Sequence, residues 1–225
     1  MMSTQTEGFG EFRDRLRSFD AAGQAAIVVI LVGIALTPPI AAGLVVMWVV
    51  LSKTPWREIG YVRPGSWVRA LSVGVIFGAA LKIAMKSVLL PYIGAPAVNP
   101  SYHYLAGNPQ ALAEFLPYAV IGAGWAEETV FRGYVFERLG KLFGTGFFAK
   151  TLIVILSSVF FGALHFQQGL LGIENATIVG AVFGSIFAVT GRLWFLMVAH
   201  LAFDLTAAIM IYFDLEPWFA HLIFH

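Results

Sequence analysis

The chain has 225 residues, of which 59% are apolar and only 12% are charged, and its mean hydropathy is +0.80. A soluble domain is roughly half apolar and a quarter charged, so this composition predicts an integral membrane protein. The net charge of +1 provides no basic face for nucleic acid, and the absence of cysteine excludes disulfides, thiol nucleophiles and thiolate metal ligands.

The N-terminal residues 1–24 mix both signs of charge ahead of the first apolar run. That run is about twice as long as a signal-peptide core and has no clear cleavage site, so we expect a retained interfacial segment. A spanning helix needs about 20 predominantly apolar residues. Windows of this kind lie at 25–51, 68–92, 111–137, 147–167, 174–191 and 193–213.

These windows predict an all-α, polytopic transmembrane bundle of about six spanning helices. It forms one domain over residues 25–213, followed by a short tail at 214–225. The first window contains Pro38 and Pro39, so we expect it either to kink or to form a re-entrant pair, because it is too short for two full spans.

Basic residues recur in alternate connections, which the positive-inside rule places in the cytosol. Simple alternation would then put the N-terminal arginines on the outer side, a conflict that disappears if the first window is re-entrant. The residues concerned are Lys53, Arg57 and Arg63 in the first basic loop, Arg138, Lys141 and Lys150 in the second, Arg192 in the third, and Arg13, Arg15 and Arg17 near the N-terminus.

Ionisable residues inside the apolar windows are the candidate functional groups, because each costs roughly 2.5–3.5 kcal/mol at the centre of a spanning helix. Glu127 and Glu128 are adjacent and point about 100° apart on a helix. Glu128 and Arg132 are four residues apart on one face, which predicts a buried ion pair that neutralises itself. Glu127 has Ala123 and Phe131 as its neighbours on that helix, so it is a candidate general base.

Two further motifs contain histidine. His165 ends an apolar window in the stretch FFGALHFQQG, where it is either a polar cap or a site residue. His200 and Asp204 lie four residues apart on one face of the last window, where Asp204 could orient the imidazole, or the pair could bind a metal or a substrate oxygen. A structural pair that bridges two helices is the alternative.

We expect the groups on these three helices to converge on one polar site, because isolated charges facing lipid are more costly. Glutamate, two histidines and an aspartate in a dry cavity can activate water and stabilise an oxyanion, which favours hydrolysis of an amide or ester. Lys82 and Lys86 form a basic stripe in the second window and either snorkel or line the cavity.

At these residues the sequence resembles the CPBP intramembrane proteases, which include the type II CAAX prenyl endopeptidases and bacterial Abi-like and bacteriocin-processing proteins. The family pattern is EExxxR, FxxxH and HxxxN or HxxxD on separate transmembrane helices. This chain has EETVFR at 127–132, FGALH at 161–165 and HLAFD at 200–204, in that order. The resemblance covers the chain from about 110 to 213.

The resemblance implies an intramembrane endopeptidase in which Glu127 acts as general base with His165 to activate water. His200 and Asp204 would stabilise the oxyanion, and Glu128 and Arg132 would support the site. Asp204 stands where the prenyl-protease members more often have Asn. Since an ionised carboxylate cannot donate to an oxyanion, Asp204 either stays protonated or acts by orienting His200.

The resemblance favours a mechanism with no metal or other cofactor. Two histidines and a glutamate are nevertheless a catalytic zinc set in soluble proteases, so zinc held by Glu127, His165 and His200 is the alternative. The sequence has no HExxH motif.

Two rival functions use the same polar site. A non-enzymatic scaffold or immunity protein would use it for binding, and a transporter would relay protons through it, although no inverted repeat is evident. For the protease, the expected partners are the lipid bilayer and a membrane-associated peptide or protein, with the oligomeric state open. The compact size favours a bacterial inner (plasma) membrane, where a prenylated substrate is not expected.

Overall fold

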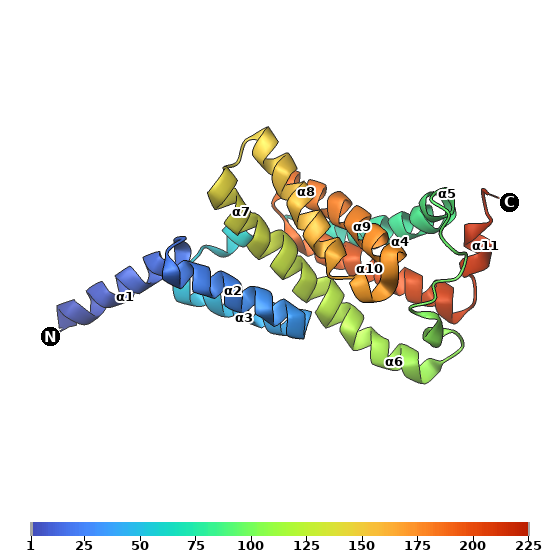
Figure 1. Cartoon of the computed structure of the whole chain (residues 1–225), viewed down its shortest axis with the longest axis horizontal. Helices are drawn as coiled ribbons and strands as arrows, with labels where there is room; N and C mark the ends of the chain where they lie inside the picture. The colour runs from blue at the N-terminus through green and yellow to red at the C-terminus, as the bar shows by residue number, and fades with distance from the viewer. Residues whose placement is uncertain (1, 225) are drawn as a thin grey trace.

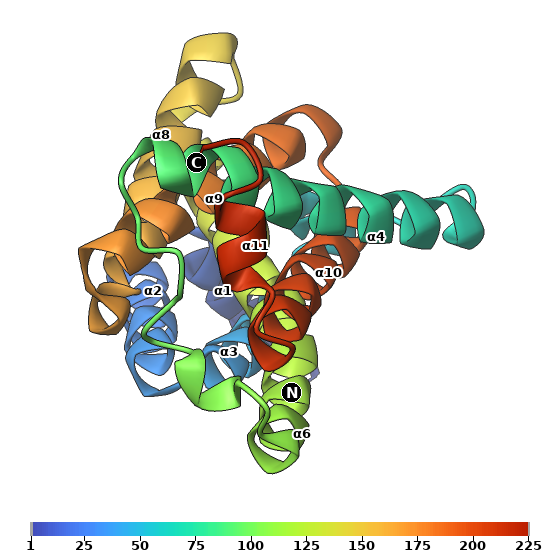
Figure 2. The same cartoon turned by 90° about the vertical axis from the view of Figure 1, so that its right-hand side faces the viewer.

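The computed structural model describes residues 2–224, and every regular element among them is helical. Figure 1 shows a bundle crossed diagonally by one long helix, and Figure 2 shows the same bundle from the side that carries the C-terminus. The all-α, polytopic bundle predicted from the sequence is thus confirmed. Its main helices are α1 (Met2–Arg17), α2 (Ala21–Leu36), α3 (Pro38–Ser52), α4 (Trp67–Ala84), α5 (Leu90–Tyr92), α6 (Pro109–Pro117), α7 (Phe136–Phe143), α8 (Phe147–Ala163), α9 (Gly169–Thr190), α10 (Leu193–Tyr212) and α11 (Glu216–Ala220).

The first apolar window forms a helical hairpin of α2 and α3 and not one kinked helix. The chain reverses at Thr37, which caps α3 by accepting a hydrogen bond from the Ile40 N–H. Pro38 and Pro39 therefore begin α3, where a missing N–H costs nothing, and they do not kink a longer helix. Helix α3 returns alongside α2, so that Trp48 Nε1 donates to the Leu16 carbonyl at 3.0 Å (Figure 1).

This hairpin removes the conflict over the N-terminal arginines. Arg17 lies 3.3 Å from Glu58 in the 3₁₀ turn η1 (Trp56–Ile59), within the first basic loop. Lys141 pairs with the same carboxylate at 3.4 Å, and Arg138 donates to the Arg17 carbonyl at 2.8 Å. The N-terminal basic segment and two basic connections therefore lie at one end of the bundle, as the positive-inside rule requires.

The diagonal helix in Figure 1 is an unbroken run over residues 109–143. It comprises α6, two wide π-helical segments, η4 (Tyr118–Glu127) and η5 (Thr129–Val135), and α7. Asn108 caps its N-terminus by accepting from the Ala111 N–H, and Gly144, with a φ of 89°, follows its end. π-Helical turns are rare and are frequently found at functional sites. Here they coincide with the EETVFR motif.

Three described helices are long and apolar enough to cross a membrane alone, at Trp67–Tyr92, Phe166–Thr190 and Leu193–Tyr212. A bent pair, Gly10–Arg17 with Ala21–Ile34, makes a fourth if it is one broken span. The sequence prediction of about six spans also counted the first window, the diagonal helix and α8. The first window is a hairpin of short helices, the diagonal helix carries three charges at its middle, and α8 has only 17 residues.

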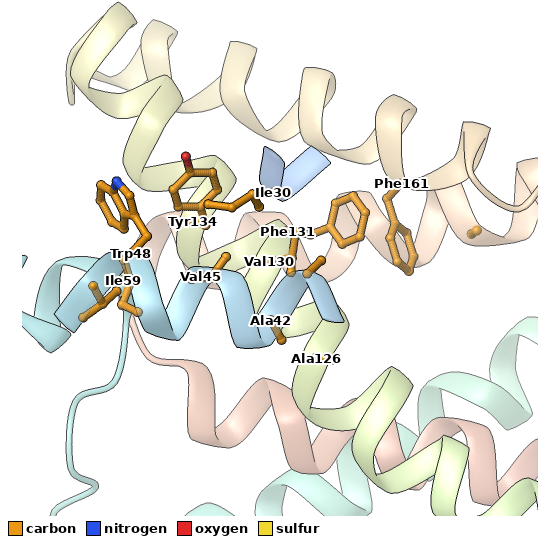
Figure 3. Close-up of a cluster of buried hydrophobic side chains, with 13 residues drawn as sticks. Ile30, Ala42, Val45, Trp48, Ile59, Ala126, Val130, Phe131, Tyr134 and Phe161 are labelled. Carbon is orange, nitrogen blue, oxygen red and sulfur yellow. The ribbon is translucent and has the colours of Figure 1, made fainter. Parts of the chain in front are cut away.

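A cluster of buried apolar side chains fixes the diagonal helix against the hairpin (Figure 3). Trp48 meets Tyr134 edge to face, with 5.0 Å between ring centroids. Phe131 stacks in the same manner on Phe161 of α8, at 4.9 Å. This core ties α2, α3, η1, α8 and α9 to the segment that carries the two glutamates. It comprises Ile30, Ala41, Ala42, Val45, Trp48, Val49, Ile59, Ala126, Val130, Phe131, Tyr134, Phe161 and Ala176.

Small residues set the closest helix crossings. Gly74 and Gly78 of α4 face Val198 and Ala199 of α10, with no room for a side chain at Gly78. Gly162 of α8 lies equally close to α9. Helices in lipid associate through such packing because burial of apolar surface offers little gain there. The α4–α10 crossing matters for function, because it holds the helix that carries His200.

We therefore expect Gly78→Ala to lower the thermal stability of the purified protein. The added Cβ would overlap the Ala199 carbonyl, and overpacking of this kind costs about 1–3 kcal/mol. Thermal unfolding in detergent measures the effect. Gly43→Ala in α3 is the matched control, since a Cβ there meets nothing within 4 Å. Equal unfolding temperatures for the two variants would contradict the close α4–α10 crossing.

Candidate active site

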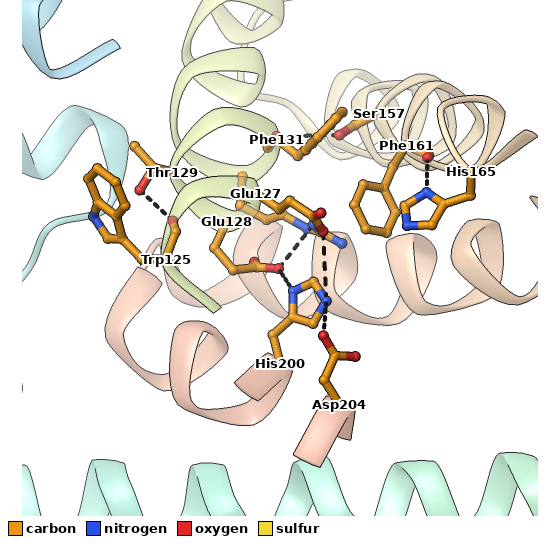
Figure 4. Close-up of polar contacts among 11 residues, drawn as sticks. Trp125, Glu127, Glu128, Thr129, Phe131, Ser157, Phe161, His165, His200 and Asp204 are labelled. Carbon is orange, nitrogen blue, oxygen red and sulfur yellow. Dashed lines mark hydrogen bonds and ion pairs between the residues drawn. The ribbon is translucent and has the colours of Figure 1, made fainter. Parts of the chain in front are cut away.

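Glu128 lies at the centre of the polar contacts within the bundle. Its side chain is fully buried, and its Oε1 lies 3.0 Å from Arg132 Nη1 and 2.7 Å from His200 Nδ1 (Figure 4). The predicted Glu128–Arg132 ion pair is therefore present, one turn apart on the diagonal helix. The same carboxylate also bridges to α10. Because a carboxylate accepts, the imidazole Nδ1–H donates, which leaves Nε2 facing away from Glu128.

Two aromatic rings complete the surroundings of Arg132. Its guanidinium carbon lies 4.7 Å from the centroid of Phe161 and 5.6 Å from that of Phe183. The Phe183 ring also meets His200 edge to face at 5.4 Å. Rings of this kind attract a cation while they exclude water. The charges that support the site are thus enclosed by groups from α8, α9 and α10.

Glu127 points elsewhere, as the angle between adjacent helical residues predicts. Its Oε2 lies 3.9 Å from His200 Nε2, and its Oε1 accepts a hydrogen bond from the Tyr118 hydroxyl at 3.4 Å. No Lys or Arg pairs with it among the described residues. Glu127 and Glu128 therefore approach opposite ring nitrogens of His200, one from the cavity and the other from the protein interior.

Asp204 and His165 lie in the same cavity wall, and neither is held by an ion pair as close as that between Glu128 and Arg132. Asp204 Oδ2 is 4.0 Å from His200 Nε2, so the group that hydrogen-bonds and orients the imidazole is Glu128 and not Asp204. His165 follows the end of α8, where its Nδ1 donates to the Phe161 carbonyl at 2.8 Å. In the neutral ring this leaves Nε2 as an acceptor. No contact between His165 and Glu127 within hydrogen-bond reach occurs among the described residues.

A cavity of about 90 Å³ brings four of the sequence candidates together. Glu127, His165, His200 and Asp204 all line it, whereas Glu128 and Arg132 stand behind its wall. The convergence predicted from the sequence is therefore present in the structure. The same cavity is also lined by Lys82, Asn99, Tyr102, Leu105, Phe115, Tyr118, Ala123, Phe161, Gln168, Asn175, Ala176, Val179, Phe203, Ala207, Ala208 and Ile211.

A larger groove of about 780 Å³ reaches Glu127 and His165 from another side. It extends from these residues to Ile34 and Pro38 at the tip of the hairpin, and past Phe115 of α6. Apolar and aromatic side chains form most of its wall, together with Tyr102, Tyr104, Tyr118, Phe131, Phe161, Leu164 and Phe166. An apolar approach of this size suits a chain segment that arrives from the bilayer.

Sequence reasoning missed Tyr118, although it contacts Glu127 directly. Nine residues separate the two, which is about 2.5 turns of an α-helix and would place them on opposite faces. In the wider π turns of η4 the same separation is about two turns, so the two side chains meet. Tyr102, Gln168 and Asn175 were missed for another reason, since nothing in their local sequence marks them as cavity residues.

The zinc alternative requires Glu127, His165 and His200 to converge on one ion. Among the described residues, no three His, Asp or Glu side chains are arranged to hold a metal ion. His165 Nδ1 and His200 Nδ1 both donate to protein acceptors, so only the two Nε2 atoms are left to face the cavity. As placed here, Glu127, His165 and His200 do not form a group of three converging ligands.

Arg132 offers a direct test of the buried charge cluster. Arg132→Met leaves the Glu128 carboxylate without its cation, and breaking one side of a buried pair costs about 3–5 kcal/mol. We expect a large fall in the unfolding temperature in detergent, and a smaller fall when Glu128→Gln is added, because no buried charge is then uncompensated. Lys150→Met, at an exposed lysine, is the control and should unfold like the wild type. An unchanged temperature for Arg132→Met alone would show that the pair does not stabilise the fold.

Comparison with known protein families identifies the segment that contains this site. Residues 109–206 match the family described as type II CAAX prenyl endopeptidase Rce1-like. No curated protein and no solved structure matched the chain. The matched segment contains all three motifs and, with them, Glu127, His165, His200 and Asp204, so the resemblance seen in the sequence is confirmed there. The match to this family, which is a protease family, thus covers the part of this integral membrane protein that contains the candidate active site.

Proposed function

We propose that this protein is an intramembrane endopeptidase that hydrolyses a peptide bond of a membrane-associated protein or peptide. The observation that carries the proposal is the arrangement around His200. Two carboxylates approach its two ring nitrogens, with Glu127 facing the cavity at 3.9 Å and Glu128 bound from behind at 2.7 Å. The cavity side thus has a carboxylate free to exchange a proton, while the other carboxylate holds the imidazole in place.

In the proposed reaction, Glu127 accepts a proton from a water molecule as that water attacks the carbonyl carbon of the substrate. His165 positions the water through Nε2, since its Nδ1 donates to the Phe161 carbonyl. The resulting oxyanion accepts hydrogen bonds from His200 Nε2–H, in the protonated ring, and from a protonated Asp204 carboxyl. The C–N bond then breaks, and Glu127 returns its proton to the leaving amine.

The groove supports a substrate that is anchored in the membrane. It leads from the hairpin tip, at Ile34 and Pro38, to Glu127 and His165. A segment that is extended or apolar can enter there without passing through the polar end of the bundle. We place the protein in a bacterial plasma membrane and propose an endogenous membrane-anchored protein or peptide precursor as its substrate class.

Glu127→Gln is the decisive variant. We expect cleavage to fall by about 10²–10⁴-fold, the contribution of a general base, with expression and unfolding temperature close to wild type. An uncleaved precursor should accumulate in the membrane proteome of cells that carry the variant. Glu11→Gln, at an exposed glutamate of α1 that lines neither the cavity nor the groove, is the matched control and should leave cleavage intact. Full retention of the cellular effect in Glu127→Gln would instead identify a scaffold or immunity protein.

A chelator tests the metal question separately. We expect cleavage by the purified protein to survive treatment with EDTA or phenanthroline, because Glu127 activates water without a Lewis acid. The purified sample should also contain less than one equivalent of zinc by elemental analysis. Activity that is lost with chelator and restored by zinc would overturn the metal-independent mechanism.

A further inference from the structure

A groove outside the candidate active site opens between α4 and α9, and the start of α10 completes its wall. It has a volume of about 650 Å³ and shares none of its described lining residues with the cavity or the groove that reach Glu127. Helix α4 crosses α10 closely (Figure 2), whereas the described residues of α4 and α9 hardly touch each other. The Leu193 N–H donates to the Gly60 carbonyl at 2.9 Å, which brings the Arg192 connection beside the first basic loop. This α4–α9 groove therefore lies at the basic end of the bundle.

Two exposed arginines line the α4–α9 groove. Arg69 lies in the first turn of α4, and Arg192 directly precedes α10. Neither forms an ion pair within 4 Å with any residue that the structure describes. The sequence gives the reason, because residues 59–113 and 175–203, which build the groove, contain no Asp or Glu. An anion that neutralises this pair of arginines must therefore come from outside the chain.

The backbone of α4 favours an anion at the same place. Ser66 caps the helix by accepting a hydrogen bond from the Arg69 N–H at 3.3 Å, and it lines the groove as well. The Arg69 guanidinium thus stands at the positive end of the helix dipole, where a cation is unfavourable by itself. An anion bound here is attracted by the dipole and by both guanidinium groups.

The wall of the α4–α9 groove changes from polar to apolar with depth. On α4, Val73 lies one turn deeper in the bundle than Arg69, and on α9, Ile186 lies one turn deeper than Thr190. Each step is about 6 Å along the helix axis. Phe195 of α10 also lines the groove beyond the basic connection. Charged and hydroxyl groups at the helix ends, with aliphatic groups one turn further in, match a phosphate headgroup followed by an acyl chain.

Aromatic rings place the mouth of the groove at the level of the lipid headgroups. The Trp194 ring lies in the groove wall and meets Trp67 edge to face, with 5.3 Å between centroids. It meets Tyr61 in the same manner at 5.4 Å. Tryptophan and tyrosine concentrate at membrane interfaces, where their rings are partly in hydrocarbon and partly among polar groups. The polar end of the groove can thus meet a headgroup while its apolar end meets hydrocarbon.

We propose that the α4–α9 groove binds an anionic phospholipid, with the phosphate between Arg69 and Arg192 and an acyl chain along Val73 and Ile186. The planar guanidinium suits phosphate because it can donate two parallel hydrogen bonds. Basic pockets between spanning helices on the cytosolic side are sites at which anionic headgroups bind. This inference goes beyond the proposed function and does not depend on it, because the groove and the candidate active site are separate.

Lipid binding can be measured on the full-length protein in a nonionic detergent by native mass spectrometry. The probes are phosphatidylglycerol and phosphatidylcholine with the same acyl chains. We expect phosphatidylglycerol to bind roughly tenfold or more tightly, as one charge-assisted hydrogen bond implies. Arg69→Gln and Arg192→Gln should each weaken this preference, and the double variant should remove it. Arg63→Gln is the matched control, since it removes the same charge from an exposed arginine of the first basic loop that does not line the groove.

The unfolding temperature in detergent gives a second measurement. Phosphatidylglycerol should raise this temperature for the wild type and for Arg63→Gln, because a ligand that binds only the folded state stabilises it, and should raise it less for the double variant. Equal affinities for the two lipids, or a preference that survives in the double variant, would overturn the inference. An equal loss in Arg63→Gln would replace the groove with diffuse attraction to the basic end of the bundle.

Glycerol phosphate, which has the headgroup chemistry but no acyl chain, separates a lipid from a soluble phosphate compound. We expect it to leave bound phosphatidylglycerol in place when both are present at the same concentration, because the apolar part of the groove contributes to lipid binding. Displacement of the lipid under these conditions would assign the two arginines to a soluble phosphate and overturn the lipid proposal.

Discussion

The arrangement of this bundle depends on how the Glu128 carboxylate is compensated. A carboxylate with no exposed surface inside an apolar bundle is tolerated only when cations and donors reach it. Arg132 supplies the charge from one turn away, and the His200 Nδ1–H supplies a donor from α10. The diagonal helix and α10 must therefore approach closely at this depth. The Phe161 and Phe183 rings then enclose the guanidinium from α8 and α9.

Glu128 binds His200 through Nδ1 from inside the protein. The Nε2 side of the imidazole is therefore left on the cavity side, where it can take part in a reaction. Glu127 points away from the ion pair because adjacent residues on a helix cannot share a direction. It meets Tyr118 and the cavity, where the π-helical turns of η4 widen the spacing along the helix. Of the two glutamates in this motif, Glu128 thus supports the site, and Glu127 is the carboxylate that faces the cavity. The same cavity continues to Lys82 at one end, and Glu127 also lines the apolar groove.

Much of the candidate site could be read from the sequence because charged residues in apolar windows are costly and therefore rare. Glu127, His165, His200 and Asp204 were identified in this way, and the structure places all four in one cavity wall. Orientation of His200 by Asp204 was one of the alternatives, and the structure instead has the two side chains 4.0 Å apart, with Glu128 forming the hydrogen bond to the imidazole. Contacts between different helices, such as Glu128 with His200, have no signature in local spacing.

The sequence by itself determined the membrane class, the helical periodicity and the ion pair of Glu128 with Arg132, because each depends on composition or on neighbours within about one turn. Only the tertiary structure decided that Pro38 and Pro39 begin a returning helix, that Tyr118 reaches Glu127, and that Lys86 is paired with Glu216 while Lys82 is not. These outcomes depend on backbone geometry and on contacts between residues distant in the chain. Packing sets both, and a linear pattern of apolar and charged residues does not record them.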